Sequence, residues 1–221
     1  MNKADVCARI AEIGILPAVR VAAAADARFA AEVVYRSGIP VIEITMTVPG
    51  AIDVIDHLAK TLPDMIVGAG TVLDGNTAQR CLDAGARFLT SPGFVPEVVE
   101  FALKNGVAVL PGALTPTEVI SAWKAGGDFV KIFPCAQVGG PEYIRALKVP
   151  LPKVRLIATV GVNQQTASGF IVAGATAVGI GGELMPPEAL SKKNECWVNE
   201  LSRRYLGLVK DGRAQRAGVR Q

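Results

Sequence analysis

The stretch DFVKIFP, residues Asp128 to Pro134, decides the fold that the chain can adopt. Its apolar residues favour strands and its final proline ends the run, so it predicts a buried strand. Lys131 stands in the middle of that strand. Burying an ammonium group without a partner is strongly unfavourable, so this lysine needs an explanation.

Two interpretations of Lys131 stay open at this point. In the first, the lysine is structural, because its charged end reaches water or pairs with a carboxylate. In the second, apolar surroundings lower the pKa of its amine, so that the neutral form can attack a carbonyl carbon. The rest of the chain decides between them.

Outward from this strand, the chain repeats a short apolar strand followed by a turn and an amphipathic helix. Strands that alternate with helices at this spacing pair in parallel through right-handed crossovers. Eight such units in 221 residues favour a (β/α)8 TIM barrel, in a single domain over residues 1–221. An open doubly wound sheet is the alternative, because periodicity does not prove closure. The expected strands are ILPAVRV, PVIEIT, MIVGAG, RFLTS, VAVLPG, FVKIF, VRLIAT and TAVGIG, beginning at Ile15, Pro40, Met65, Arg87, Val107, Phe129, Val154 and Thr176.

The expected helices close on Gly-containing turns that favour a left-handed stop. Thr115 and Glu118 have the spacing that predicts a capping box for one of them. The first residues predict a short amphipathic helix in front of the barrel. A last helix, from about Glu195 to Val209, is expected to pack outside it, followed by a frayed basic tail over residues 210–221. Other helical stretches are ARFAAEVVYRSG, AIDVIDHLAKTL, NTAQRCLDAG, TPTEVISAWKAG and NQQTASGFIVAG.

Composition argues against several classes of function. Half of the residues are hydrophobic, 5% are aromatic and the net charge is +3, which is not the interleaved basic and aromatic pattern of a nucleic-acid-binding face. The uncharged stretch between Arg155 and Glu183 contains many polar residues, so it predicts a strand, a helix and a second strand rather than a membrane span. We therefore expect neither nucleic acid nor a membrane as a partner.

The cysteine and histidine content bounds the chemistry. Four cysteines without C-x-x-C spacing predict reduced thiols and a cytoplasmic location. His57 is the only histidine, which argues against a multi-histidine metal site, and we expect no metal and no cofactor. We interpret Cys135 as a small buried hydrophobic residue and assign no catalytic role to His57.

A second buried charge, Glu43, lies in the strand VIEIT. Alternation places its side chain on the same face as Thr45, and it places Lys131 on the same face as Phe133. If both charges point to the barrel axis, they form an interior acid–amine pair. That pair either satisfies two charges, which is a poor way to stabilise a core, or performs chemistry. A lysine amine forms an iminium with a ketone, and a nearby carboxylate moves the protons.

Several motifs of the chain resemble the class I aldolases that cleave 2-keto-3-deoxy-6-phosphogluconate (KDPG), a family that also handles 4-hydroxy-2-oxoglutarate (KHG). The resemblance implies a homotrimeric barrel in which Lys131 forms the Schiff base and Glu43 is the general acid and base. It further implies that Thr71, Pro92 and Phe133 line the pyruvyl pocket. The motifs, spread between Ile15 and about Gly182, are VIEITMTVPGA, VGAGTV, TSPG, VLPGALTPTE and VKIFP followed by GG.

The chain departs from this family where the substrate carboxylate is bound. Many members carry an arginine at the position of Thr47, and some relatives that share the threonine place an arginine at the end of the first strand, as Arg20 is here. Arg20 is thus either the carboxylate clamp or a surface arginine.

Two more departures lie on the loops after the seventh and eighth strands, where the family holds phosphate. One glycine of a pair is lost at Val160, and Glu183 stands where a small residue is usual. A carboxylate would repel a phosphate, or it could point away as a helix N-terminal residue. The candidate substrate contacts are Arg20, Thr45, Thr47, Thr71, Pro92, Phe133, Thr159, Gly161, Gly181, Gly182 and Glu183.

The resemblance predicts a lyase that cleaves a 2-keto-3-deoxy sugar acid or 4-hydroxy-2-oxoglutarate to pyruvate and an aldehyde. Two other functions compete with this one. A sugar-phosphate isomerase or epimerase would use Lys131 only to stabilise an oxyanion. A non-catalytic trimeric barrel would bind a ligand or another protein without turnover.

Overall fold

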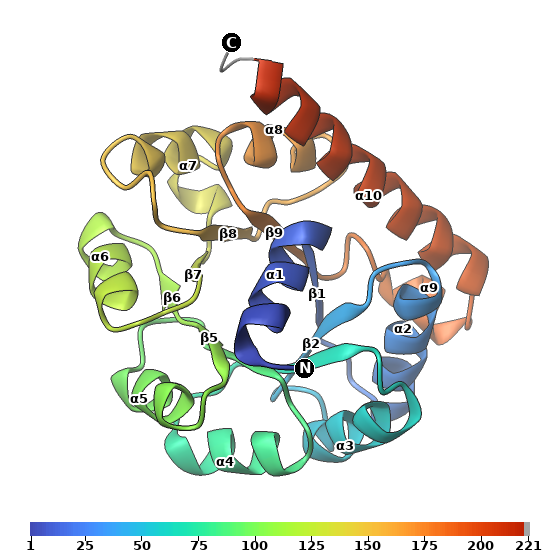
Figure 1. Cartoon of the computed structure of the whole chain (residues 1–221). Helices are drawn as coiled ribbons and strands as arrows, with labels where there is room; N and C mark the ends of the chain where they lie inside the picture. The colour runs from blue at the N-terminus through green and yellow to red at the C-terminus, as the bar shows by residue number, and fades with distance from the viewer. Residues whose placement is uncertain (219–221) are drawn as a thin grey trace.

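The computed structural model describes residues 1–218 and shows parallel strands surrounded by helices (Figure 1). The strands are β1 Ile15–Val19, β2 Val41–Thr45, β3 Ile66–Gly70, β4 Phe88–Thr90, β5 Ala108–Leu110, β6 Gly112–Ala113, β7 Val130–Ile132, β8 Leu156–Thr159 and β9 Ala177–Ile180. The helices are α1 Lys3–Ile13, α2 Ala24–Arg36, α3 Ala51–Thr61, α4 Gly75–Asp83, α5 Pro96–Lys104, α6 Pro116–Lys124, α7 Pro141–Lys148, α8 Ala167–Val172, α9 Pro187–Ser191 and α10 Glu195–Gly218, with a 3-10 turn, η1, at Ala136–Val138.

The predicted barrel is confirmed, and the open sheet is not. Within residues 1–218 the nine strands form one sheet in the order β5-β4-β3-β2-β1-β9-β8-β7-β6. β5 and β6 are two parts of one strand that Pro111 interrupts, because proline cannot donate a backbone hydrogen bond. The first part pairs with β4 and the second with β7, so this strand completes the circle. The eight predicted strands therefore correspond to the eight strands of the barrel, when β5 and β6 are counted as one.

Apolar side chains fill the interior of the barrel at the end where the strands begin. Inward-facing residues of the strands form a buried cluster that includes Leu16, Val41 and Phe88. Helix α1 covers this end, and its Val6 and Ile10 belong to the same cluster (Figure 1). Because the bottom layers are closed by hydrocarbon, polar residues inside the barrel occur only nearer the carboxyl ends of the strands.

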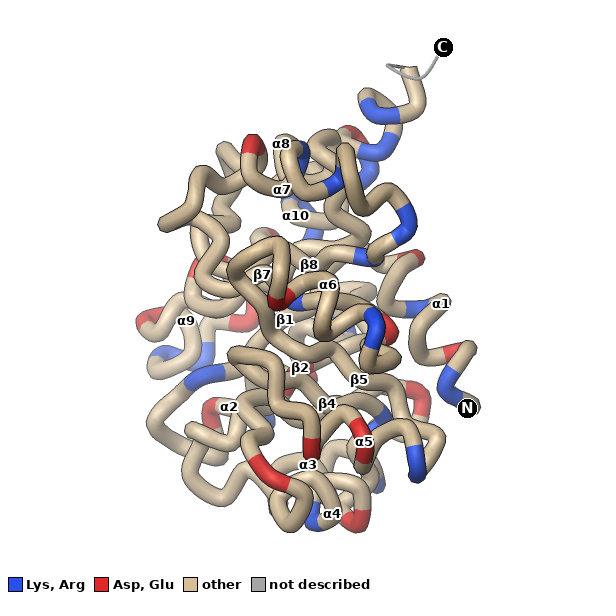
Figure 2. Tube along the Cα trace, turned by 90° about the vertical axis from the view of Figure 1, so that its left-hand side faces the viewer, with Lys and Arg blue, Asp and Glu red and all other residues tan. Residues whose placement is uncertain are grey.

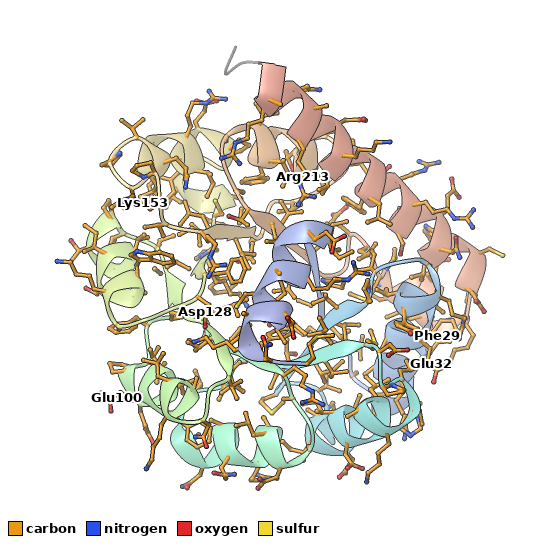
Figure 3. The ribbon with its side chains drawn as sticks, viewed as in Figure 1. Phe29, Glu32, Glu100, Asp128, Lys153 and Arg213 are labelled. Carbon is orange, nitrogen blue, oxygen red and sulfur yellow. The ribbon has the colours of Figure 1, made fainter. Side chains whose placement is uncertain are left out.

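Polar contacts fix α1 over the barrel at both ends. Lys3 forms an ion pair of 2.9 Å with Asp128, just before β7. At the other end, Arg213 of α10 donates to the carbonyl groups of Ala11 and Glu12, and Figure 3 shows Arg213 beside α1. The predicted N-terminal helix is thus confirmed, and it also has a capping box between Asn2 and Asp5.

The predicted capping box at Thr115 and Glu118 is present at the start of α6. The uncharged stretch forms β8, α8 and β9, as expected. None of the helices within residues 1–218 is long and apolar enough to cross a bilayer. The helix that we expected over residues 163–174 begins later, at Ala167, because the side chain of Asn163 first accepts the N–H groups of a turn.

The prediction for the C-terminal end was wrong. Helix α10 continues to Gly218, so residues 210–218 are helical instead of a frayed tail, and residues 219–221 lie outside the described part of the chain. Figure 2 shows the concentration of basic residues along the end of this helix. Gly212 explains the extension, because a Cβ atom there would lie 2.9 Å from Ile171 of α8, so the two helices are in close contact.

A substitution at Gly68 tests the packing of the apolar cluster inside the barrel. A Cβ atom at this position would lie 2.2 Å from the ring of Phe88, a distance that no packed core tolerates. We expect Gly68→Ala to lower the free energy of unfolding by about 1–3 kcal/mol, measured by urea denaturation. Phe88→Leu should recover part of that loss in the double variant. Gly93→Ala is the control, because nothing lies within 4 Å of its Cβ position. If Gly68→Ala and Gly93→Ala lowered the free energy of unfolding by the same amount, the close contact between Gly68 and Phe88 would be contradicted.

Candidate active site

Lys131 and Glu43 meet inside the barrel. Their strands, β7 and β2, lie on opposite sides of the eight-stranded barrel, so the two side chains approach each other across its interior. The Nζ atom of Lys131 donates to Oε1 of Glu43 over 3.3 Å. The two side chains are only 9% and 2% exposed. The structure thus brings together the two buried charges whose alternation predicted an interior acid–amine pair.

The space for Glu43 comes from glycine on the neighbouring strand β3. Thr45 pairs with Gly70 and Glu43 pairs with Gly68, so the glycines lie beside the carboxylate-bearing strand. A Cβ atom on Gly70 would lie 2.1 Å from Oε1 of Glu43. The sequence analysis named VGAGTV only as a motif of the family resemblance and missed this role. The alternation of Gly68 and Gly70 on the inner face was the available signal.

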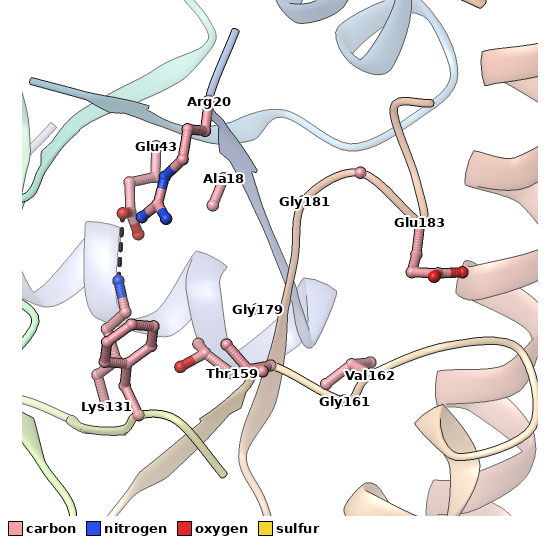
Figure 4. A pocket seen from close by; sticks show the side chains of 13 residues that line it. Ala18, Arg20, Glu43, Lys131, Thr159, Gly161, Val162, Gly179, Gly181 and Glu183 are labelled. Carbon is pink, nitrogen blue, oxygen red and sulfur yellow. Dashed lines mark hydrogen bonds and ion pairs between the residues drawn. The ribbon is translucent and has the colours of Figure 1, made fainter. Parts of the chain in front are cut away.

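A cavity of about 350 Å³ opens from the Lys131–Glu43 pair toward the carboxyl ends of β1, β8 and β9. Figure 4 shows the pair at one end of this cavity and Glu183 at the other. The Nζ atom of Lys131 lies 5.9 Å from the ring centroid of Phe133, which covers the amine on one side. The cavity is lined by Ala18, Arg20, Glu43, Lys131, Phe133, Thr159, Val160, Gly161, Val162, Gly179, Gly181, Gly182 and Glu183.

Arg20 belongs to the cavity and not to a remote part of the surface. It follows β1 directly, and alternation places it on the inner face above Ala18. Figure 4 shows its guanidinium group directed into the cavity, beside Glu43. Arg20 therefore offers a planar, permanently charged donor group a short way from the amine of Lys131, which suits a carboxylate.

Four predicted substrate contacts are not on the cavity wall, namely Thr45, Thr47, Thr71 and Pro92. The hydroxyl group of Thr45 donates to the carbonyl of Val19 over 2.8 Å and lies 2.7 Å from that of Thr47. The backbone of Pro92 packs against Gly112, where a Cβ atom would come within 2.2 Å. Thr159 does line the cavity, but its hydroxyl group donates to the carbonyl of Ile132, which ties β8 to β7.

Thr90 is an inner residue that sequence reasoning did not single out. It lies on β4, two residues after Phe88 of the inner cluster, so alternation directs it to the barrel interior. Its hydroxyl group is fully buried and has no hydrogen-bond partner among the described residues. Strand β4 lies between the strands of Glu43 and Lys131 on the side away from the cavity.

Two β-branched residues at strand ends have left-handed backbone conformations. Thr71, after β3, has φ of 61°, and Val160, after β8, has φ of 71°. Such residues adopt positive φ only when the surrounding structure holds them there, and they are often found at functional sites. Val160 lines the cavity with 39% of its surface exposed, so the strain is located at the rim of the site.

The cysteines take no part in this site. Cys135 follows β7 closely but is fully buried, and its thiol donates to the carbonyl of Gly140. Burial raises the pKa of Cys7, Cys81 and Cys135 to about 11, so these three remain thiols at neutral pH. The interpretation of Cys135 as a small buried residue is confirmed. His57 lies on α3, away from the residues that line the cavity.

Comparisons with known proteins point to one family. A family model described as KDPG and KHG aldolase matches residues 6–201. The chain is 32% identical over 197 residues to a 2-dehydro-3-deoxy-phosphogluconate aldolase of Pseudomonas aeruginosa, covering 88% of this chain and 89% of the relative. It is 35% identical over 153 residues to a probable 2-dehydro-3-deoxy-6-phosphogalactonate aldolase of Rhizobium meliloti, covering 68% and 72%. A crystal structure of KDPG aldolase from Legionella pneumophila, with pyruvate captured as a covalent carbinolamine, is similar with a TM-score of 0.83 at 30% identity, covering 89% and 96%.

A substitution at Val160 tests whether the backbone at the rim of the site is strained. Glycine tolerates φ of 71°, whereas a left-handed L-residue costs about 1–2 kcal/mol. We expect Val160→Gly to raise the free energy of unfolding by up to about 1 kcal/mol, after the entropic cost of glycine. This gain corresponds to an increase in Tm of about 2–4 °C, measured by calorimetry. Val162→Gly is the control and should destabilise, because Val162 is buried without a positive φ. A lower Tm for Val160→Gly would contradict the strain.

Proposed function

The chain belongs to the KDPG and KHG aldolase family and is thus a lyase, and from this premise we propose that Lys131 and Glu43 perform its Schiff-base chemistry. The substrate class that we propose is a 2-keto-4-hydroxy acid, namely a 2-keto-3-deoxy sugar acid or 4-hydroxy-2-oxoglutarate. The products are pyruvate and an aldehyde. The observation that carries the proposal is the 3.3 Å contact between an amine and a carboxylate inside a cavity.

Formation of the Schiff base uses both members of the pair. The neutral amine of Lys131 adds to the C2 carbonyl and gives a carbinolamine. The carboxyl group of Glu43, which faces the same nitrogen, donates a proton to the departing hydroxyl group. Water leaves, and the C2 carbon is joined to Nζ as an iminium.

Cleavage follows from the electron demand of the iminium. Removal of the proton on the C4 hydroxyl group, by Glu43 directly or through one water, allows the C3–C4 bond to break. The electron pair of that bond moves to the iminium and forms an enamine, while C4 leaves as the aldehyde. Glu43 then returns a proton to C3, and hydrolysis of the resulting iminium releases pyruvate and restores the amine.

Arg20 and Phe133 fit the two ends of the pyruvyl group. The guanidinium group of Arg20, directed into the cavity beside Glu43, would pair with the carboxylate on C1. The ring of Phe133 provides an apolar wall beside the amine. The roles of Thr71 and Pro92 in this pocket stay predictions from the resemblance, because neither residue is on the cavity wall.

The proposal extends to assembly and location. The resemblance supports a homotrimer built from one catalytic domain per chain, and sedimentation velocity of the purified protein would measure its mass. The four free cysteines support a reducing compartment, that is, the cytoplasm.

Borohydride trapping tests the covalent step. Reduction in the presence of pyruvate should convert the iminium to a stable secondary amine, so intact-mass analysis should show one pyruvyl adduct per chain and peptide mapping should place it on Lys131. Lys131→Ala should give no adduct and no turnover. An isomerase, an epimerase or a non-catalytic barrel would give no adduct in the wild-type chain. Trapping on a lysine other than Lys131 would also contradict the proposal.

Replacement of the carboxylate tests the proton transfers. Glu43→Gln keeps the shape of the side chain but cannot accept a proton, so kcat should fall by about 10²–10⁴-fold while the fold persists. Gly70→Ala should lower kcat through the same group, because its Cβ atom displaces Oε1 of Glu43. The double variant should have nearly the same kcat as Glu43→Gln alone, because both changes act on the same carboxylate. Steady-state kinetics and circular dichroism measure these effects, and a kcat for Glu43→Gln within threefold of the wild type, about 0.65 kcal/mol, would exclude the role.

A further inference from the structure

No lysine or arginine among the described residues lines the end of the cavity away from Lys131. Among the described residues that line the cavity, the only cations are Lys131 and Arg20. Figure 4 shows both of them at the end where Glu43 lies. The other end is formed by the loops that carry Gly161 and Glu183, and Figure 4 shows the carboxylate of Glu183 directed away from Lys131, toward α10.

Glu183 is an exposed carboxylate without a counter-ion. It makes no ion pair or hydrogen bond within the described part of the chain, unlike Glu188, which pairs with Lys192 over 2.7 Å. It does not cap α9 either, because α9 begins at Pro187 without a side-chain cap. Figure 4 shows its side chain at the cavity end beside α10. The negative charge of Glu183 thus lies at the end of the cavity far from Lys131, without a charged partner among residues 1–218.

This arrangement is unfavourable for a phosphate. If Arg20 holds the carboxylate of the keto acid, no side-chain cation remains for a second anionic group among the described residues that line the cavity. A unit charge placed about 4 Å from Glu183 would lose about fivefold in affinity even at the dielectric constant of water, and more inside a cavity.

The same end suits hydroxyl groups. A carboxylate accepts hydrogen bonds from hydroxyl donors without any charge conflict. Val160 adds an apolar branched side chain at the rim, held there at φ of 71° despite the strain. The polar and apolar surfaces together match the carbon chain and hydroxyl groups of a neutral polyol tail.

We infer that the substrate is an unphosphorylated 2-keto-3-deoxy sugar acid, and that Glu183 and Val160 select it over the corresponding 6-phosphate. The inference rests on the proposed function, because it requires the keto acid to be attached at Lys131. It separates this chain from the relatives whose names specify phosphorylated sugar acids.

The test compares matched substrates with and without phosphate. Pyruvate release from 2-keto-3-deoxygluconate and from its 6-phosphate, and from the galactonate pair, gives the ratio of kcat/KM values. The same four compounds are also measured as inhibitors of the exchange of pyruvate methyl protons into deuterated water, which reports binding without cleavage. We expect the wild type to favour an unphosphorylated compound over its phosphate by about tenfold or more. This preference should shrink as salt is added, because salt screens the repulsion.

Variants assign the preference to Glu183. Glu183→Gln and Glu183→Ser should each move the ratio toward the phosphate by about fivefold or more. Val160→Gly should move it in the same direction. Glu188→Gln, which removes an exposed carboxylate outside the cavity, should leave the ratio as in the wild type. A wild type that prefers the phosphates, or a ratio that both Glu183 variants leave unchanged, would overturn the inference. If the wild type shows no pyruvate exchange at all, the proposed function itself fails.

Discussion

The buried contact between Lys131 and Glu43 is the constraint on which the rest of the structure depends. Two charged side chains that come from opposite walls of a barrel must be long enough to meet, and neighbouring residues must leave room for them. Gly70 provides the room next to Glu43, because a Cβ atom there would lie 2.1 Å from Oε1. The glycine at this position thus follows from the pair, while the layers at the amino-terminal ends of the strands are hydrocarbon that α1 covers.

A pair of this kind is a weak source of stability, because hydrophobic residues of similar volume often stabilise a core as well or better. Its presence is explained by chemistry instead. In the mechanism that we propose, the amine is the nucleophile, and Glu43 is the carboxylate that contacts it among the described residues of the cavity wall. We propose that Arg20 at one end and Glu183 at the other then divide the cavity into an end for an anion and an end for hydroxyl groups.

Much of this could be predicted from the chain because the signals are local. Alternation around Lys131 and Glu43 indicated the inner face, and the strand–helix repeat indicated the barrel. What failed depends on contacts between distant segments. The extension of α10 to Gly218 relies on close packing against α8, and the turn at Asn163 competes with the start of that helix. Thr45 stays a predicted substrate contact, and its hydroxyl group donates to the carbonyl of Val19 on the neighbouring strand, a partner that no pattern in β2 alone reveals.

The most direct measurement is a crystal structure of the protein soaked with pyruvate. The account predicts continuous electron density from Nζ of Lys131 to C2 of the ligand, with Glu43 within hydrogen-bonding distance of the new bond and the ligand carboxylate on Arg20. Pyruvate bound elsewhere, or bound in the cavity without a bond to Lys131, would contradict it.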